Sequence, residues 1–556
     1  MLEKNLRAID NDSLKRRLLH ISPVESKQGV SYCVTPSNDY VLLKNDMPCD
    51  DLGNPRDAIK QMIEKTIKTE MKSNDIIINF GIGLGYLLDE TFNKFPSKIF
   101  VYEPDIYLLH FVLSNVDISE HLSSGRVFLT NDLKELTDKI SAVFLTKDKV
   151  EILYLQNYAI AKNKELLMLT QKVFDTCKSK MVDVNTITKF SKKWLINTIA
   201  NIAHVRDNKA YLLSDLEGKF IGQTAFIAAA GPSLDDNIAD LQANRDKFVV
   251  FAVNKCVKYL LQNGITPDFV VALDAEYIEK TLSGLQEQLA RANCIMDIRT
   301  DSSVFRQNFN KIFINFSETD FFIKKIAKYN PSINFYESGG SAATLALVAA
   351  AKMGFSKIVF AGLDLAFKEN IIYSTGEVLK KASYDEIVVD NVKKKMVQVR
   401  SVNGKMVYSR EDYQTFITHF AKLIKELNYS EVYNLSSFGA QIEGIKPIAF
   451  EELRLYGSSS LQQLTFIKPF NFEIKQFIDE EFCQINNIIS MLSKGSFSTA
   501  LVNTIVKSMF VYQYLQAEVL TVLQKNFDPQ LAEEFIAETK TAIKVVVENL
   551  QKYKLL

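Results

Sequence analysis

Three residues near the middle of the chain, Gly231, Pro232 and Ser233, follow an apolar run and precede a segment typical of a helix. A strand, a glycine turn and a helix start can present main-chain N–H groups to a phosphate without any basic side chain. The alternative is a plain helix cap, in which Ser233 caps the helix and Asp236 completes a capping box. Because Asp235 and Asp236 oppose an anion at that helix end, a phosphate would have to lie at the backbone of 231–233.

Other polar residues follow the ends of expected strands. Asn254 comes directly after the run FVVFAV, a place where Asn is also a common helix cap. Asp274 and Glu276 lie at the end of the run FVVALDAE. Their spacing is similar to the Asp-x-Asp of metal-dependent glycosyltransferases, but two-acid matches arise often by chance, so no metal is expected.

A small-residue motif, Ser338, Gly339, Gly340 and Ser341, precedes the segment AATLALVAAAKMG. Small residues allow a helix to pack closely on a sheet, which is one interpretation. Glycine and serine at a helix start also leave main-chain donors open to a phosphate or carboxylate. Together with Gly231–Ser233, this motif would define a single cleft for an anionic nucleotide.

A further glycine turn lies in the first part of the chain. The run DIIINF is followed by Gly81, Gly83 and Gly85, and Glu103 comes near the end of the next expected strand. Glycines at a turn and an acidic residue about 20 positions later are typical of a nucleotide-binding half of a Rossmann fold. The sequence therefore indicates a possible ligand site for S-adenosylmethionine or a dinucleotide, or else an accessory scaffold.

The elements that must position these residues are apolar runs of strand length, at 224–230, 248–253, 269–274, 294–298, 311–316 and 357–362. Several lack polar alternation, as parallel strands covered on both faces do. The segments between many of them have helical length and spacing. These features predict the α/β class, with a central doubly wound, Rossmann-like sheet whose carboxyl edge carries the ligand. Asn403 and Gly404 lie between two alternating runs and predict a hairpin.

The length of 556 residues exceeds what one hydrophobic core supports. We expect an N-terminal Rossmann-like domain with connector helices over 1–200, a central domain over 201–455 and a helical C-terminal domain over 456–556. Between about residues 105 and 201 the pattern is expected to be mainly helical.

Composition excludes several classes. Lys plus Arg and Asp plus Glu both number 66, which argues against a nucleic-acid partner. The six cysteines are scattered without metal-ligand spacing. No apolar stretch reaches the length of a membrane span, and the charged first residues do not form a signal peptide. We therefore expect a cytoplasmic protein with no membrane span and no firmly expected cofactor.

The order of four segments identifies a resemblance to a known family. These segments are FIAAAGPSLDDNI, VFAVNKCVKYLLQNGITPDFVVALD, SGGSAATLALVAAAKMGFSKIVFAGLDLAF and VYNLSSFGAQIEGI, and they span roughly 210–446. The central third resembles the motility associated factor (Maf) proteins, which are flagellin glycosyltransferases with a domain shared with MptE-like pterin pyrophosphokinases. The flanking regions also look like the Maf layout, so the resemblance covers nearly the full chain.

The same motifs are similar to those of bacterial sialyltransferases that use CMP-sialic acid, which have a GT-A-variant fold. The resemblance implies transfer of a CMP-activated nonulosonic acid, of pseudaminic or legionaminic type, to Ser or Thr hydroxyls of flagellin during flagellum assembly for motility. It implies that Gly231, Pro232 and Ser233 hold the CMP phosphate and that Asn254 contacts the nucleotide sugar. It further implies that the motif 338–341 faces the donor.

The resemblance implies several different candidates for the catalytic residues. Asp364, in GLDLAF, would end a strand beside the reaction centre. The related sialyltransferases place a histidine base beyond that strand, where this chain has Tyr373. Tyr373 could donate a hydrogen bond to the departing phosphate, or simply pack over the sheet edge. Candidates for the base are Asp274, Asp364 and His419.

Two alternatives stay open at this point. One is an MptE-like pterin pyrophosphokinase, which would bind ATP with magnesium. The other is a non-catalytic flagellin-binding assembly factor, which the absence of the histidine favours.

Overall fold

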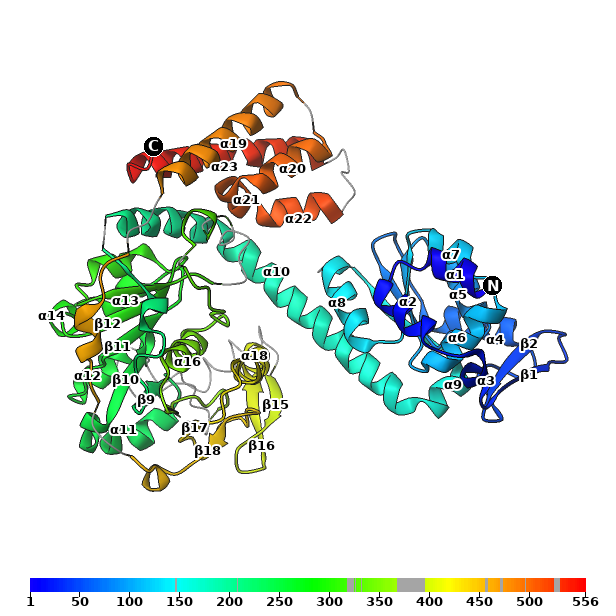
Figure 1. Ribbon diagram of the computed structural model, residues 1–556, viewed down its shortest axis with the longest axis horizontal. Helices are drawn as coiled ribbons and strands as arrows, with labels where there is room; N and C mark the ends of the chain where they lie inside the picture. Colours follow the sequence, from blue (N-terminus) through cyan, green and yellow to red (C-terminus); the bar gives the residue numbers. More distant parts are fainter. Residues whose placement is uncertain are drawn as a thin grey trace. The chain divides into compact units, whose positions relative to one another are not determined.

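The fold is that of a computed structural model of the chain, shown in Figure 1. It describes residues 1–145, 148–207, 209–317, 325, 327–331, 333–367, 396–455, 459–470, 474–495, 497–524 and 531–556. The chain divides into two compact units, one of residues 1–188 and 520–528 and the other of residues 189–519 and 529–556. The C-terminal helices lie mostly within the second unit. The expected division into three domains remains a prediction.

The first unit is built on a four-stranded parallel sheet in the order β6-β5-β4-β7. Its strands are β4 (Ile76–Phe80), β5 (Lys98–Tyr102), β6 (Val127–Thr130) and β7 (Val150–Tyr154). Residues 105–201 are mainly helical, as expected, but they also contain the strands β6 and β7, which the sequence did not indicate. Both are short, and β7 is only partly buried, so their apolar runs gave a weak signal.

Short helices and a small antiparallel sheet complete this unit. The helices are α1 (Leu2–Ala8), α2 (Asp12–Leu19), α3 (Pro23–Lys27), α4 (Pro55–Thr66), α5 (Tyr86–Lys94), α6 (Ile106–Asn115), α7 (Ser119–Ser123), α8 (Leu133–Val143) and α9 (Gln156–Ala161). The antiparallel strands are β1 (Val30–Val34), β2 (Tyr40–Lys44) and β3 (Met47–Pro48). Helix α10 (Asn163–Arg206) begins in the first unit and ends in the second.

The second unit is centred on a nine-stranded sheet in the order β18-β17-β14-β9-β10-β11-β12-β13-β8, in which every neighbouring pair is parallel. The strands are β8 (Tyr211–Leu212), β9 (Thr224–Ala228), β10 (Phe248–Val253), β11 (Phe269–Ala272), β12 (Asn293–Asp297), β13 (Ile312–Asn315), β14 (Lys357–Ala361), β17 (Val432–Asn434) and β18 (Lys446–Pro447). From β9 the chain moves in one direction to β13 and then returns to β14 on the other side of β9. The predicted α/β class with a central doubly wound sheet is therefore confirmed.

Helices cover the sheet because its central strands are apolar on both faces. The helices of this region are α11 (Ser233–Ala243), α12 (Val257–Gln262), α13 (Ile278–Leu282), α14 (Gln286–Leu289), α16 (Ala342–Met353) and α18 (Glu411–Leu427). Helices α16 and α18 share one core with Phe251, Phe269 and Phe360, all fully buried. On the other face, Phe226 and Val250 are also fully buried. The central strands thus lose nearly all contact with water, which explains their continuous apolar runs.

The predicted hairpin at Asn403 and Gly404 is confirmed: β15 (Met396–Arg400) pairs antiparallel with β16 (Met406–Arg410). The predicted helical C-terminal region is also present, as α19 (Lys475–Ser493), α20 (Thr499–Lys507), α21 (Met509–Tyr514), α22 (Gln516–Gln524) and α23 (Ala532–Lys552). Among the described residues, no helix has both the length and the apolar character that crossing a membrane requires.

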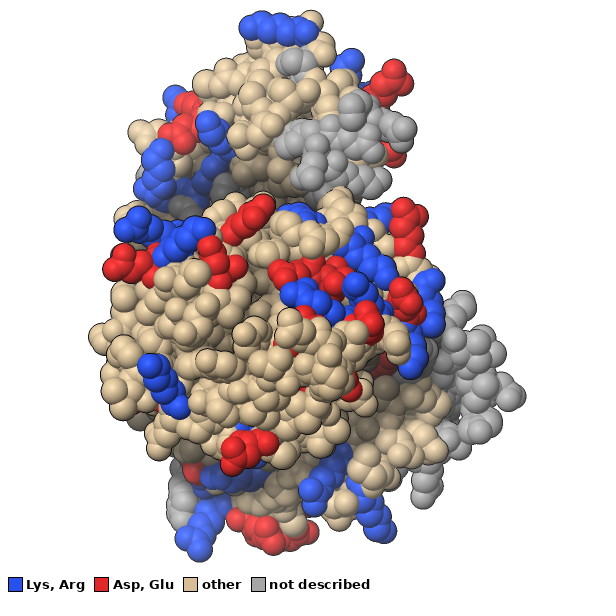
Figure 2. Space-filling view, turned by 90° about the vertical axis from the view of Figure 1, so that its right-hand side faces the viewer, with Lys and Arg blue, Asp and Glu red and all other residues tan. Residues whose placement is uncertain are grey.

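On the face seen in Figure 2, Lys and Arg side chains are intermixed with Asp and Glu side chains. This agrees with the equal counts of 66 basic and 66 acidic residues. Neither sign of charge dominates the described residues of that face, so electrostatics there does not favour a polyanionic partner.

Candidate functional site at the carboxyl edge of the sheet

The structure places most of the predicted central residues at one edge of the nine-stranded sheet. Ser233 follows β9, Asn254 follows β10, Asp274 follows β11 and Asp364 follows β14. Because these strands are parallel neighbours, their carboxyl ends meet at the same edge. Residues distant in sequence are thus gathered where open α/β sheets bind ligands.

The turn at Gly231–Ser233 is joined to the end of β14. The Gly231 N–H donates to the carbonyl of Gly362 (2.8 Å), and the Ser233 N–H donates to Asp364 Oδ2 (2.8 Å). Pro232 has no N–H to offer. The amides of this turn are therefore occupied within the protein, which contradicts their expected role as phosphate donors.

Ser233 also differs from its expected role as a helix cap. Helix α11 begins at Ser233 itself, and Pro232 occupies the cap position without a side-chain hydrogen bond. The Ser233 hydroxyl instead accepts from the N–H of Gly362 (3.0 Å). The capping box with Asp236 is thus wrong, because tertiary pairing with the β14 loop takes the hydroxyl that would have capped the helix.

Asp364 holds this junction together. Only 1% of Asp364 is exposed, and besides the Ser233 amide its carboxylate accepts a hydrogen bond from the Ser436 hydroxyl. Burial raises the pKa of Asp364, although these hydrogen bonds oppose the shift. Its burial and its hydrogen bonds indicate a structural group, in contrast to the catalytic base considered from the sequence. The next residue, Leu365, has a φ of +45°, an uncommon backbone state of the kind found at functional sites.

Asn254 and Asp274 form the second group at this edge. The Asn254 side-chain amide lies 3.4 Å from Asp274 Oδ2, as donor to acceptor. Asn254 is 2% exposed, whereas Asp274 is exposed to solvent. A fixed amide next to an accessible carboxylate can hold that carboxylate toward a reacting hydroxyl. Asp274 is therefore better placed as a base than Asp364.

The motif 338–341 forms the start of α16. Ser341 caps the helix in a reciprocal capping box with Thr344. Gly339 and Gly340 have φ values of +65° and +81°, so both glycines serve a left-handed turn. Gly340 is exposed, and within the described part of the chain neither its N–H nor that of Ala342 has a hydrogen-bond acceptor. Among the described residues these main-chain donors at a helix N-terminus are therefore unoccupied, unlike those at Gly231–Ser233.

Two further candidates were Tyr373 and His419. Tyr373 lies outside the described residues. His419 lies within α18, and its Nδ1 atom is buried without a hydrogen-bond partner among the described residues.

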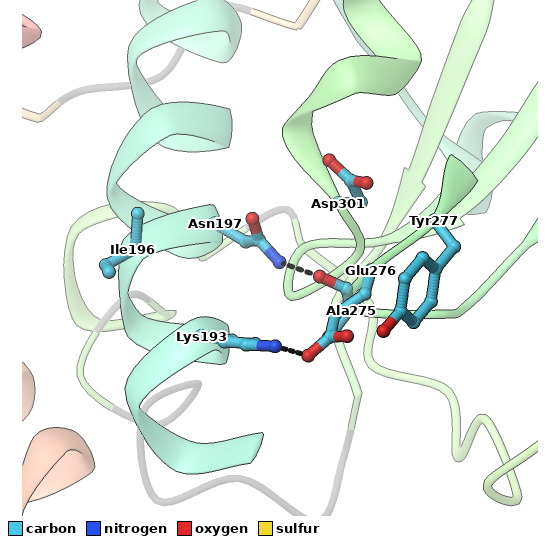
Figure 3. Close-up of a pocket in the computed structure, with 7 residues that line it drawn as sticks. All are labelled: Lys193, Ile196, Asn197, Ala275, Glu276, Tyr277 and Asp301. Carbon is cyan, nitrogen blue, oxygen red and sulfur yellow. Dashed lines mark hydrogen bonds and ion pairs between the residues drawn. The ribbon is translucent and has the colours of Figure 1, made fainter. Parts of the chain in front are cut away.

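A pocket of about 490 Å³ opens beside Asp274 and is drawn in Figure 3. It is lined by Lys193, Ile196, Asn197, Ala275, Glu276, Tyr277 and Asp301. Lys193 and Asn197 project from α10 toward the loop after β11, where Lys193 forms an ion pair with Glu276. The Asn197 side chain donates to the carbonyl of Ala275 (3.0 Å).

The sequence interpretation missed Lys193, Asn197 and Tyr277 as site residues. Nothing in the helical pattern of α10 sets Lys193 or Asn197 apart from other polar positions. Tyr277 has a φ of +68° and is 68% exposed, features that no sequence pattern shows. The Glu276 carboxylate, whose spacing from Asp274 is similar to that of a metal-binding pair, forms an ion pair with Lys193.

The possible N-terminal ligand site is closed. Gly81, Gly83 and Gly85 all have positive φ, as a glycine turn requires, and all three are buried. A Cβ on Gly81 would lie 2.7 Å from the ring of Tyr158, so this ring occupies the space above the turn. Of the two interpretations that the sequence left open, the packing of α9 on the turn favours the accessory scaffold over a site for S-adenosylmethionine or a dinucleotide.

Glu103 completes this closed arrangement instead of binding a ribose. It is fully buried and accepts hydrogen bonds from the N–H groups of Ile82 (3.1 Å) and Asp105 (2.9 Å) and from the Tyr158 hydroxyl. Burial raises the pKa of Glu103 to about 7, although these hydrogen bonds lower it. The glycine turn and the acidic residue are thus a structural unit in this chain.

Comparison with known proteins extends these observations. Residues 196–370 match a family model described as 6-hydroxymethylpterin diphosphokinase MptE-like. An uncharacterized protein of Treponema pallidum (strain Nichols) is 29% identical over 97 residues, which are 17% of this chain and 44% of that protein. The matched region is thus less than half the length of this curated relative.

A solved structure matches over the whole chain. It is the structure of MAf glycosyltransferase from Magnetospirillum magneticum AMB-1, with a TM-score of 0.67 and 16% sequence identity, covering 100% of this chain and 96% of the other. At 16% identity, the likeness establishes the fold and not the function. The predicted Maf resemblance is confirmed at that level, over both units of the chain.

Proposed function

From the Maf-like fold over the full chain, we propose that this protein is a glycosyltransferase whose reaction takes place at the carboxyl edge of the nine-stranded sheet. The donor is a CMP-activated nonulosonic acid of pseudaminic or legionaminic type. The acceptor is a Ser or Thr hydroxyl of flagellin, so the modification serves flagellum assembly and motility. The observation that carries the proposal is the full-length match to a Maf glycosyltransferase fold, together with accessible polar groups at the sheet edge.

The donor phosphate lies at the start of α16 in this proposal. The amides of Gly340 and Ala342, which have no acceptor among the described residues, and the positive end of the helix dipole favour an anion there. Asn254 contacts the nucleotide sugar with its side-chain amide. The turn at Gly231–Ser233 shapes the edge without donating to the phosphate.

The reaction exchanges one C–O bond for another. The bond from the anomeric carbon to the phosphate oxygen breaks, and CMP leaves with the electron pair. The acceptor hydroxyl attacks the opposite face of the oxocarbenium-like sugar, and its proton passes to Asp274, so the product has inverted configuration. A hydrogen bond from Tyr373 to the leaving phosphate remains part of the proposal.

A cytoplasmic site of action and the absence of a required metal are also part of the proposal. All six cysteines are free thiols, as is usual in a reducing compartment.

The test uses the purified protein with a CMP-activated nonulosonic acid and purified flagellin. The intact mass of flagellin should rise by one or more sugar residues, and CMP alone should release heat in titration calorimetry. Asn254→Ala should abolish transfer, whereas Asn244→Ala, at the C-terminal end of α11, should transfer at the wild-type rate. No mass increment and no heat with CMP would disprove the proposed activity.

The match of residues 196–370 to the MptE-like model favours one competing function, diphosphate transfer to a pterin. That activity requires ATP with magnesium. Heat release with ATP and magnesium but not with CMP would support it in place of glycosyl transfer.

A further inference from the structure

The pocket beside Asp274 lies next to the proposed reaction site but is separate from the donor contacts. Asp274 contacts Asn254 on one side, and the pocket begins with the next residue, Ala275. The Asp274 carbonyl accepts from the N–H of Asp301 (3.0 Å), so a pocket residue is tied to the strand end that carries the candidate base. A molecule in the pocket would therefore contact residues that adjoin Asp274 in sequence or are hydrogen-bonded to its main chain.

The lining of the pocket selects a particular chemistry. It offers one ammonium group on Lys193, two carboxylates on Glu276 and Asp301, and the phenol of Tyr277. This mixture does not favour a phosphate, because the carboxylates outnumber the single cation. It does favour a ligand with both hydrogen-bond donors and acceptors, which a polypeptide main chain and its hydroxyl side chains supply.

Two features hold the pocket open in a fixed shape. The Asn197 side chain donates to the carbonyls of Ala275 (3.0 Å) and Arg299 (3.2 Å), which joins α10 to two strand ends. Asp301 accepts from the N–H of Ile278 (3.3 Å), directly after Tyr277. The site is thus pre-organised before any acceptor arrives.

Tyr277 is the most unusual residue of this lining. Its backbone is left-handed, with a φ of +68°, although tyrosine rarely adopts this state. The residue is 68% exposed, and its ring stands at the pocket in Figure 3. Strained backbone conformations cluster at functional sites. Tyrosine is also enriched at protein interfaces, so both features of Tyr277 point to recognition of a partner.

We infer that this pocket binds an extended segment of the acceptor protein, with Tyr277 packing against it and Lys193 and Glu276 bonding its main chain. The inference rests on the proposed function, since it identifies the acceptor side of the same reaction. The segment would place its Ser or Thr hydroxyl beside Asp274. The pocket is thereby an acceptor site rather than a second donor site.

The test compares Tyr277→Asn and Lys193→Ala with the wild-type protein. Asn tolerates the left-handed backbone, so Tyr277→Asn removes the ring without adding strain. Tyr107→Asn is the matched control, because Tyr107 is 46% exposed on α6 of the first unit. Thermal unfolding of each variant verifies that it folds.

Both pocket variants should raise the KM for flagellin roughly tenfold, with CMP affinity unchanged in calorimetry. The control should change neither value. An unchanged KM for flagellin in both variants would overturn the inference. A raised KM only for a free glycoside acceptor would overturn it as well, because the pocket would then bind a polyol.

A direct measurement of flagellin binding separates this inference from the proposed function. If the wild-type protein binds flagellin but neither binds CMP nor transfers sugar, the glycosyltransferase proposal fails. The pocket is then judged by binding alone: a roughly tenfold weaker complex with Tyr277→Asn supports it. Equal binding by wild type and variant, or no binding of flagellin at all, refutes it.

Discussion

Two aspartates at the same edge of the sheet have opposite surroundings. Asp364 is buried and accepts hydrogen bonds from the turn after β9 and from Ser436. Asp274 is exposed and has a long hydrogen bond from Asn254 (3.4 Å). Burial and pairing make the first a structural group, whereas access makes the second available to a substrate hydroxyl.

Asp274→Asn should reduce the rate of transfer by roughly 100-fold or more, because an amide cannot accept the proton of the attacking hydroxyl. CMP affinity should stay the same, since the shape of the edge is kept. Steady-state kinetics and calorimetry measure the two effects. Asp246→Asn is the control, because Asp246 is exposed and precedes β10 at the opposite edge. Equal rates for Asp274→Asn and wild type would exclude Asp274 as the base.

Glu103 should make the free energy of unfolding of the first unit depend on pH. Its pKa is raised by burial to about 7 from an ordinary value of 4.5. Between these two values the unfolded chain loses the proton while the folded chain keeps it. The free energy of unfolding should therefore fall as the pH rises from about 4.5 to about 7, by about 3 kcal/mol in total from this residue.

Glu103→Gln should remove this part of the pH dependence, because glutamine does not titrate. Denaturant unfolding at several pH values between 4.5 and 8 measures the difference in slope from wild type. Glu120→Gln provides the comparison, since Glu120 is exposed on α7. Parallel curves for wild type and Glu103→Gln would show that Glu103 does not keep its proton in the folded protein.

At the scale of elements, the edge of the sheet depends on how closely β9 and β14 approach. The turn after β9 and the loop after β14 exchange three hydrogen bonds, from Gly231 to Gly362, from Gly362 to Ser233 and from Ser233 to Asp364. A side chain at Gly231 would overlap with the Gly362 carbonyl and with Asp364 Oδ2. The φ of Gly231 is not in the left-handed region, so the backbone conformation does not require glycine here. The close packing of the two segments does.

Gly231→Ala should lower the free energy of unfolding by about 2 kcal/mol or more, because the main chain of the loop after β14 cannot move aside cheaply. It should also weaken CMP binding by displacing the edge. Gly53→Ala is the control: an added Cβ there would meet only a side-chain oxygen of Asp51, at 3.1 Å. Denaturant unfolding and calorimetry measure both effects. A fully stable Gly231→Ala would mean that the junction tolerates a wider separation of the two strands.

At the scale of the whole molecule, the chain has a hydrophobic core in each unit. One core includes Leu109 and belongs to the first unit, and another includes Phe251 and belongs to the second. Each unit buries its own apolar residues, which is the condition for folding as a separate cooperative unit.

Calorimetry of the full chain should therefore show two thermal transitions. Leu109→Ala should lower the temperature of one transition and Phe251→Ala that of the other, because each substitution leaves a cavity in a single core. CMP should raise only the transition lowered by Phe251→Ala, since ligand binding stabilises the unit that holds the site. A single transition that both substitutions lower together would show that the two units unfold as one.

Local patterns in the sequence determined the central elements of this protein. Strand β10 coincides with the run 248–253, and Asn403 and Gly404 lie at the predicted hairpin. Such features depend on hydrophobic periodicity and turn chemistry between neighbouring residues, which a sequence displays directly. The placement of Asn254 and Asp274 after the carboxyl ends of two strands followed from the same information, whereas their contact with each other is a finding of the structure.

Only the tertiary structure decided which polar groups stay accessible. Gly231–Ser233 and Gly81–Gly85 both have the pattern of a phosphate-binding turn, yet Asp364 and Gly362 occupy the first and Tyr158 covers the second. Conversely, Lys193 joins Glu276 at a pocket that no motif marks. The physical reason is that residues far away in the chain decide whether a hydrogen-bond donor is paired and whether a cavity is filled. The local sequence does not contain that information.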